Sequence, residues 1–303
     1  MTSSPRTDIY ARVTDRIVAD LEQGVRPWQK PWSAPNDDRL TLRPRRASGE
    51  PYRGINVLLL WGAAQEGGFT RNVWMTYKQA AALGAQVRKG EHGALVVYAD
   101  RFTKTETDGQ GEESAREIAF MKGYTVFNVQ QIDGLPAQFC EPPSPRDDNH
   151  SAHLITAAEA FFARTGATVQ HGGNRAFYAP SRDVIQLPPV QAFRDAESYA
   201  VTKAHELVHW TAHPSRLARE LGKRFGDQAY AAEELIAEMG AAFLCADLGI
   251  TPDIRDDHAA YLAHWLQVLK ADSRAIFTAV SQGQRAADFL HTLARQQQAA
   301  AVA

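Results

Sequence analysis

The stretch His205-Glu206-Leu207-Val208-His209 determines how the C-terminal half of this chain is interpreted. It has the pattern H-E-x-x-H, and residues four apart on a helix lie on the same face. Both imidazoles can therefore reach one zinc ion, with Glu206 beside them to accept a proton from a water molecule on the metal. Val201 and Ala204 give the same helix an apolar side to bury. The pattern predicts a metal site on a buried helix, with Glu206 as the general base.

A catalytic zinc site also needs a third protein ligand and an open coordination position. His213 lies eight residues after the start of the motif, about 12 Å along a continuous helix, which is too far. The next helix offers Glu234 and Glu238, which are four residues apart and share a face. We predict Glu234 as the third ligand and Glu238 as an acceptor that orients a ligand histidine. Glu233, about 100° around the helix, is the less favoured ligand, and a solvated acidic helix face is the alternative.

Two further features bear on a hydrolytic site. The short strand 184–187 precedes the metal-site helix, and we expect it to pair with an extended peptide substrate by strand addition. Transition-state stabilisation needs a hydrogen-bond donor near the metal, and His213, Tyr230 and Tyr199 are unranked candidates.

Composition limits the class of protein. The chain has 303 residues, 44% of them hydrophobic and 22% charged, as expected for a globular protein of about two domains. The longest strongly apolar run, 55–64, is too short to span a bilayer, and no apolar leader precedes the first mixed-charge helix. The two cysteines, Cys140 and Cys245, form no disulfide framework. We therefore expect a cytoplasmic protein without a membrane partner.

The order of the predicted elements indicates an α+β fold. Helices are predicted at 9–21, 55–65 and 76–83, and strands at 94–98 and 124–129, with a polar hairpin loop over 103–117 between them. The Pro-rich polar segment 134–151 separates these elements from a mostly helical C-terminal part. Strands are predicted at 176–179 and 184–187 and helices at 151–164, 197–212, 227–248 and 257–271. The predicted domains are 1–135 and 151–303, joined by a linker at 136–150.

Residues 26–90 differ in charge from the rest of the chain. They contain eleven Lys or Arg and four Asp or Glu, a net charge of +7, whereas the whole chain carries −2. The same segment holds four of the six tryptophans. Basic groups follow phosphates and aromatic rings stack on bases, a combination typical of single-stranded nucleic-acid binding; buried tryptophans with a solvated basic rim are the alternative. The predicted contacts are Trp28, Lys30, Trp32, Arg43, Arg45, Arg46, Tyr52, Arg53, Trp74, Tyr77, Lys78, Arg88 and Lys89.

Several strings of the chain are specific rather than compositional: 27–32 (PWQKPW), 52–57 (YRGINV), 76–79 (TYKQ), 87–91 (VRKGE), 126–131 (VFNVQQ), 205–210 and 233–243. With these strings the chain resembles one known family, the ArdC-type antirestriction proteins of conjugative plasmids and their chromosomal relatives. The resemblance implies an N-terminal single-stranded DNA-binding domain and a C-terminal zincin-like metallopeptidase domain. It also implies a role in protecting incoming DNA, as in conjugation, against host restriction.

Within this family resemblance, three functions remain open. The first is a single-stranded DNA-binding antirestriction protein with a gluzincin-like site of His205, His209 and Glu234. The second is an active metallopeptidase or toxin that cleaves a specific protein. The third is a DNA-binding module whose metal is only structural. All three expect Zn²⁺, or another divalent ion such as Mn²⁺ or Co²⁺, in the same site.

Overall fold

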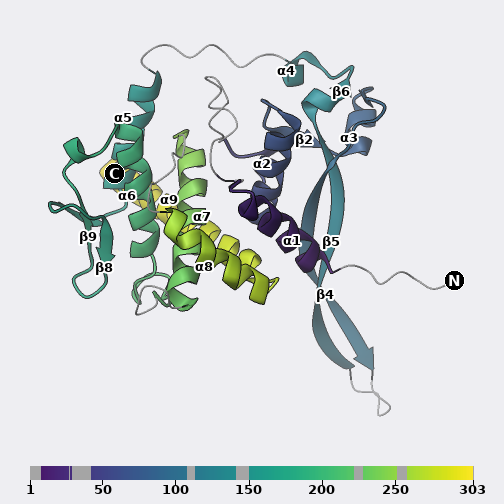
Figure 1. The fold of residues 1–303 in the computed structure, drawn as a ribbon. Coiled ribbons are helices and arrows are strands. Elements are labelled where there is room, and N and C mark those ends of the chain that lie inside the picture. Colours follow the sequence, from purple (N-terminus) through teal and green to yellow (C-terminus); the bar gives the residue numbers. More distant parts are fainter. Residues whose placement is uncertain are drawn as a thin grey trace.

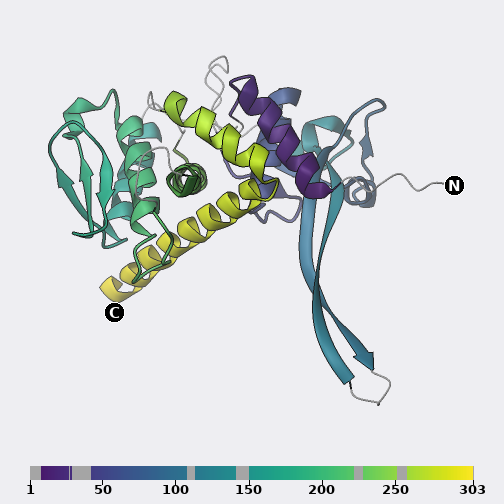
Figure 2. The same ribbon diagram turned by 60° about the horizontal axis from the view of Figure 1, so that its bottom comes forward.

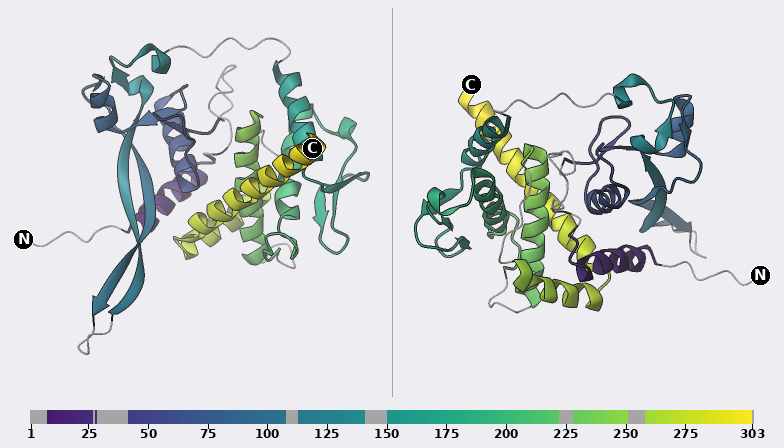
Figure 3. Two further views of the ribbon diagram at one scale, coloured as in Figure 1. Left: turned by 180° about the vertical axis from the view of Figure 1, so that it is seen from behind. Right: turned by 45° about the horizontal axis from the view of Figure 1, so that its top comes forward.

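The structure is a computed structural model that describes residues 8–26, 28, 42–107, 113–140, 150–221, 228–250 and 258–302. A strand-rich N-terminal part and a largely helical C-terminal part lie side by side (Figures 1 and 3). The predicted α+β class is confirmed. Among the described residues, no helix combines the length and the apolar character needed to cross a membrane.

The N-terminal part begins with an amphipathic helix whose Val13, Ile17 and Leu21 face the core, as their spacing predicts. A capping box at Thr76 and Gln79 starts the third helix: each side chain accepts a hydrogen bond from the other residue's backbone N–H. The elements are α1 (Ile9–Glu22), β1 (Arg45–Arg46), α2 (Ile55–Gly67), β2 (Val73–Met75), α3 (Tyr77–Ala82), β3 (Gln86–Val87), β4 (Ala94–Thr107), β5 (Glu113–Asn128), β6 (Ile132–Asp133) and α4 (Ala137–Cys140).

The N-terminal sheet has the strand order β1-β2-β5-β4, and β3 pairs separately with β6. Strands β4 and β5 form an antiparallel hairpin that extends away from the helices (Figures 1 and 2). Their pairing continues from Ala94↔Val126 to Thr107↔Glu113. The predicted hairpin loop over 103–117 is therefore wrong for 103–107 and 113–117, whose backbones pair as strands. The β-branched residues Thr103, Thr105 and Thr107 favour this extended conformation in β4. Residues 108–112 lie outside the described residues.

The C-terminal part packs helices against a small sheet. Its elements are α5 (His150–Ala163), β7 (Thr168–His171), β8 (Phe177–Ala179), β9 (Val184–Leu187), α6 (Ala196–Trp210), α7 (Gln228–Leu248), α8 (His258–Ala271) and α9 (Ala275–Val302). The sheet order is β7-β9-β8, with β9 parallel to β7 and antiparallel to β8. Both edges of β9 are thus already paired. The expected strand addition of a peptide to β9 is wrong, because no unpaired backbone edge remains on it.

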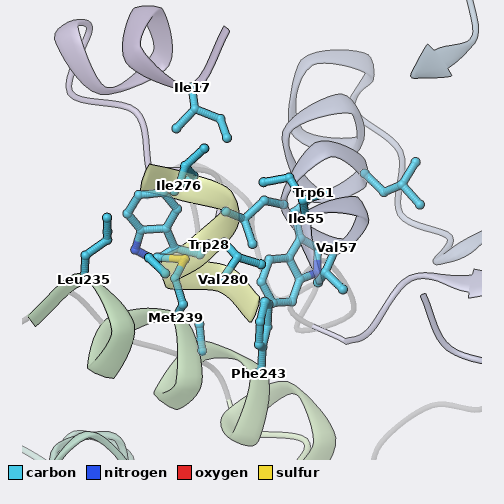
Figure 4. Close-up of a cluster of buried hydrophobic side chains, with 14 of the residues drawn as sticks. Ile17, Trp28, Ile55, Val57, Trp61, Leu235, Met239, Phe243, Ile276 and Val280 are labelled. Atoms are coloured by element: carbon cyan, nitrogen blue, oxygen red, sulfur yellow. The ribbon is translucent and has the colours of Figure 1, made fainter. Parts of the chain in front are cut away.

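One hydrophobic cluster contains side chains from both sides of the predicted domain boundary. Trp61 of α2 lies against Phe243 of α7, with ring centroids 6.0 Å apart (Figure 4). The Trp28 ring centroid lies 6.3 Å from that of Trp265 of α8. Such burial of large aromatic side chains is a main source of packing energy. The division into two domains remains a prediction. Of its linker, 137–140 are helical and 141–149 lie outside the described residues.

Glycines allow the C-terminal helices to approach closely. A Cβ at Gly240 of α7 would lie 2.8 Å from Val208 of α6, and a Cβ at Gly283 of α9 would lie 2.8 Å from the Gly240 nitrogen. Helix α7 therefore packs between α6 and α9 at a crossing that tolerates no side chain. This close approach brings the acids of α7 to the motif on α6.

Candidate metal centre

Helix α6 positions the H-E-x-x-H motif. Asp195 caps its first turn by accepting a hydrogen bond from the Ser198 backbone N–H at 2.7 Å. Every residue of the helix from Tyr199 to Trp210 is buried, because the sheet β7-β9-β8 and α7 cover it. The motif's polar side chains are therefore buried with it, and each needs a partner inside the protein.

Helix α7 supplies that partner. His205 Nε2 lies 3.1 Å from His209 Nε2, and the Glu234 carboxylate lies 3.4 Å from His205 Nε2 and 3.6 Å from His209 Nε2. Ligand atoms of the three residues all lie within 4.8 Å of one another. The structure thus brings together the three predicted ligands from two helices.

The spacing suits a divalent metal. Ligand bonds of about 2.0–2.1 Å in tetrahedral geometry place ligand atoms about 3.3 Å apart, which matches the three distances. Two imidazoles and a carboxylate form a donor set that zinc, manganese and cobalt accept. Among the described residues, no fourth group joins this cluster. The residues therefore fit a divalent ion that keeps one coordination position open.

Glu233 and Arg219 hold His209 from behind. The Glu233 carboxylate lies 3.2 Å from His209 Nδ1 and accepts two hydrogen bonds from the Arg219 guanidinium, at 2.8 and 3.0 Å. Because a carboxylate only accepts, Nδ1 carries a proton, and Nε2 is the nitrogen that faces the cluster. Arg219 also donates to the Val208 carbonyl at 2.8 Å, which ties this arrangement to the end of α6.

Glu238 lies behind His205 and contacts the N-terminal part. Its carboxylate is 3.8 Å from His205 Nδ1, a longer distance than a hydrogen bond, and it accepts a hydrogen bond from the Trp28 indole N–H at 3.1 Å. His205 Nδ1 is buried and has no hydrogen-bond partner among the described residues. The orienting role of Glu238 therefore stays a prediction: its carboxylate lies near His205 Nδ1 but beyond hydrogen-bond distance, whereas the Glu233 carboxylate is within hydrogen-bond distance of His209 Nδ1.

The electrostatics of the site favour a cation. Burial alone would lower the pKa of His209, but the hydrogen bond to Glu233 and the charges of Glu234 and Glu206 outweigh it and raise the pKa to about 9. Burial would raise the pKa of Glu234, but the hydrogen bond with His205 and the charge of His209 lower it to about 2. These carboxylates stabilise positive charge at the point where the imidazoles meet.

The general-base candidate is present in the same helix, and one donor candidate lies close by. Glu206 is buried with 3% of its surface exposed. Of the three candidate donors, Tyr230 makes a side-chain hydrogen bond to Glu234. His213 hydrogen-bonds to Ser215, and Tyr199 to His171 at 3.0 Å. Tyr230 is therefore the candidate with a direct contact to a predicted metal ligand.

The structure corrects part of the predicted nucleic-acid interface. Trp28, Arg43, Tyr52 and Trp74 are at most 7% exposed. Arg43 forms a bidentate ion pair with Asp247, at 2.8 and 3.0 Å. These four side chains lie in or against the core. Contact with DNA bases or phosphates is therefore wrong for Trp28, Arg43 and Trp74, whereas Tyr52 lines a pocket of the N-terminal sheet. Trp28 and Arg43 instead connect the N-terminal part to α7.

The other predicted DNA contacts are either exposed or outside the described residues. Arg45, Arg46, Arg53, Tyr77, Lys78, Arg88 and Lys89 are exposed, whereas Lys30 and Trp32 lie outside the described residues. Exposure is compatible with the predicted contacts but does not single out any of them.

Sequence reasoning missed two groups that build the site. Glu233 was ranked below Glu234 as a metal ligand, because adjacent residues on a helix point about 100° apart. In the structure both acids reach histidines, Glu234 between the two rings and Glu233 on the far nitrogen of His209. Arg219 had no local signal, because its partner Glu233 lies on the next helix. The adjacent Glu233-Glu234 pair was the available hint for the first group.

The buried helix with two histidines, the glutamate from the next helix and the glutamate general-base position define a zincin-like metal centre. The comparisons with known proteins agree. A family model described as a zincin-like metallopeptidase matches residues 156–282, and one described as the N-terminal domain of anti-restriction factor ArdC matches residues 7–127.

Solved structures of the antirestriction protein ArdC from plasmid R388 are similar over 95% of this chain and 98% of theirs. The metal-free structure is 46% identical with a TM-score of 0.78, and the Mn(II)-bound structure is 45% identical with a TM-score of 0.75. The chain therefore belongs to the ArdC antirestriction family and has a zincin-like metallopeptidase domain.

Two further relatives are similar over nearly the whole chain. An uncharacterised protein of Sinorhizobium fredii is 43% identical over 96% of this chain and 94% of its own length. The DNA primase TraC of Escherichia coli is 39% identical over 95% of this chain, which spans only 27% of the primase.

Proposed function

We propose that this protein binds single-stranded DNA through its N-terminal part and holds a divalent metal at His205, His209 and Glu234, and that both serve antirestriction. The convergence of these three side chains from α6 and α7, at the spacing of metal ligands, carries the proposal. The Mn(II)-bound structure of a 45% identical ArdC protein supports a divalent ion.

The chain's own groups have distinct roles in this site. When bound, the metal supplies Lewis acidity that activates a water molecule and polarises a carbonyl. Glu206, buried beside the cluster, takes up a proton and delivers it to a leaving amine. Glu233, held by Arg219, keeps the His209 proton on Nδ1. The three-ligand set among the described residues favours a hydrolytic site over a purely structural one, which is closed by four protein ligands.

The DNA-binding part of the proposal is supported by exposed basic groups and by the family. Arg45, Arg46 and Lys78 are exposed in the N-terminal part. That part matches the N-terminal domain of ArdC, and the whole chain is similar to a segment of a DNA primase. Exposed cations bind phosphates with a strong dependence on salt concentration.

The decisive experiment compares wild type with Glu206→Gln in three assays: metal content, oligonucleotide binding and protection of incoming DNA from restriction. Glutamine keeps the volume of the side chain and removes the base. We expect unchanged metal content and unchanged DNA binding, with loss of protection. Glu220→Gln, at an exposed glutamate, is the matched control and should behave as wild type.

The other outcomes identify the alternative functions. Full protection by Glu206→Gln with metal bound would show that the metal is structural. Cleavage of a candidate restriction subunit by wild type, absent in Glu206→Gln, would show an active peptidase. If wild type binds no single-stranded oligonucleotide at low salt, the DNA-binding part of the proposal is wrong.

A further inference from the structure

Two exposed tyrosines lie next to each other on the N-terminal hairpin. Tyr98 of β4 is 48% exposed and Tyr124 of β5 is 46% exposed, with ring centroids 6.5 Å apart. The strand register places Tyr124 opposite Val96 and Tyr98 opposite Lys122. The two rings are therefore diagonal neighbours. Large aromatic side chains that remain half exposed on a sheet offer ring surface to a ligand.

These tyrosines line a pocket of about 290 Å³ on the N-terminal sheet. Val96, Val97 and Val126 contribute apolar surface to it. This size lies near the lower limit of pockets that hold small ligands, which suits a flat ring better than an extended segment of chain. The lining residues are Arg46, Tyr52, Asn56, Thr76, Gln79, Val96, Val97, Tyr98, Tyr124 and Val126.

The charge of this pocket suits an anion at its margin. Arg46 is the only charged residue among the described residues that line it. Its guanidinium lies 5.5 Å from the centre of the Tyr52 ring, and its ion pair with Glu50, at 3.2 Å, is exposed on both sides. An exposed ion pair is weak, so a phosphate can replace Glu50 as the partner of Arg46. Asp100, hydrogen-bonded to the Tyr98 hydroxyl, is a carboxylate at the Tyr98 end.

The larger pocket of the same part, about 870 Å³ between α1, α2 and the hairpin, is less suited to DNA. Three arginines line it, Arg12, Arg16 and Arg88, and three carboxylates match them in number, Asp20, Glu66 and Glu91. Arg16 pairs with Glu66, and Arg88 pairs with Glu91. Its tryptophan, Trp74, is 1% exposed and offers no ring face for stacking. Charge and ring exposure therefore both favour the smaller pocket.

We propose that the pocket formed by Tyr98, Tyr124 and Arg46 binds a base of single-stranded DNA. The base stacks on the tyrosine rings, and Arg46 contacts the adjoining phosphate. This inference rests on the proposed DNA-binding function and assigns it a site. The sequence prediction relied on aromatic residues of the segment 26–90, of which Trp28 and Trp74 are buried. Tyr98 and Tyr124 lie outside that segment and take the stacking role instead.

The test is fluorescence anisotropy with labelled oligothymidylate and the full chain. Stacking contributes about 1–3 kcal/mol per base, so we expect Tyr98→Ala and Tyr124→Ala each to weaken binding about 5- to 150-fold. The phenylalanine variants at both positions keep the ring and should bind within about twofold of wild type. Phe177→Ala removes a ring that is 41% exposed on β8, outside this pocket, and should bind as wild type.

Salt dependence tests the role of Arg46 separately. For single-stranded DNA, each phosphate contact contributes about 0.7 to the slope of log affinity against log salt. We expect Arg46→Ala to reduce the slope by about this amount. The tyrosine variants should keep the wild-type slope. Circular dichroism and thermal melting of each variant exclude misfolding as the cause of weaker binding.

The outcomes separate the two proposals. If wild type binds oligothymidylate and the double variant Tyr98→Ala/Tyr124→Ala binds equally well, the pocket assignment is wrong and the DNA-binding function stands. If the phenylalanine variants bind as weakly as the alanine variants, stacking is wrong. If wild type does not bind oligothymidylate at all, the proposed DNA-binding function itself is wrong.

Discussion

The metal centre and the exposed face of the N-terminal part use charged side chains in opposite ways. At the metal centre, His205, His209, Glu233 and Glu234 are buried and contact one another across two helices. On the N-terminal face, Arg46 and its partner Glu50 are exposed. A buried charge needs a partner of defined geometry, whereas an exposed one is solvated with or without a partner. The buried histidines of the H-E-x-x-H motif are therefore identifiable from sequence, whereas the role of an exposed arginine is not.

Arg43 is the informative exception. It belongs by sequence to the basic segment, but it is 6% exposed and pairs with Asp247 and Gln284. Its guanidinium also lies 4.5 Å from the centre of the Phe243 ring. It resembles the groups of the metal centre in burial and those of the exposed N-terminal face only in charge. Substitutions at buried and at exposed charges separate these two uses of charge.

The largest effect is expected from removing a predicted ligand. His205→Ala should abolish retention of a stoichiometric divalent ion, because two remaining ligands hold an ion weakly. Metal content after dialysis and isothermal titration measure the effect. His213→Ala removes a histidine that pairs with Ser215 outside the cluster and should retain metal. Equal retention by both variants would exclude this site.

Removing the counter-charge behind the site should destabilise the fold. Arg219→Ala leaves Glu233 buried with its charge less compensated, and we expect a loss of about 3–5 kcal/mol in the free energy of unfolding. Urea denaturation measures it. Arg194→Ala removes an arginine that is 63% exposed, and it should change stability by less than about 0.5 kcal/mol. A similar small change for both would show that the Arg219 pair is not buried in solution.

Arg43 and Arg53 form a matched pair, since both connect the N-terminal part to the C-terminal helices. Arg43→Ala should lower stability by about 2 kcal/mol, because it breaks charged hydrogen bonds that are partly buried. Arg53→Ala breaks an exposed pair with Asp288 and should barely affect stability. Oligonucleotide titrations should give the reverse order for DNA binding, with Arg53→Ala the weaker binder. The same order in both assays would contradict the assignment of Arg43 to the core and of Arg53 to DNA binding.

The pairing of Arg43 predicts a dependence of stability on pH. Burial would raise the pKa of Asp247, but its contacts with His291 and Arg43 outweigh it and lower the pKa below the ordinary value. The carboxylate therefore contributes stability above about pH 4, and this contribution is lost as pH falls through the lowered pKa. Asp247→Asn should lose less stability than wild type between about pH 6 and pH 3 in urea titrations. Glu50→Gln, at an exposed pair, should follow the wild-type profile.

The smallest effect is expected at the contact between the N-terminal part and the metal centre. Trp28→Phe removes the hydrogen bond to Glu238, which lies beside His205, and should weaken metal binding by roughly 3- to 10-fold. Trp61→Phe is the control in the same core, because its indole N–H donates to the Leu42 carbonyl instead. Equal metal affinities of the two variants in isothermal titration would show that the Trp28 contact serves packing alone.

Local features were predictable from sequence. The apolar spacing of α1, the capping box of α3 and the i, i+4 histidines of α6 depend on residues within one or two helical turns. Glu234 was predictable as a candidate metal ligand, because a catalytic zinc site requires a third protein ligand in addition to the two histidines. Its distance from the histidines depends on Gly240, where α7 packs against α6, and no local pattern reports that crossing.

Sequence alone thus determined most of the helices and the chemistry of the motif, because helical periodicity and ligand identity are properties of short segments. Tertiary structure decided which acid meets which histidine nitrogen. It also decided that Trp28, Arg43 and Trp74 pack in the core while Tyr98 and Tyr124 stay exposed. The physical reason is that burial of an aromatic ring or a guanidinium depends on partners distant in sequence, here on α7, α8 and α9.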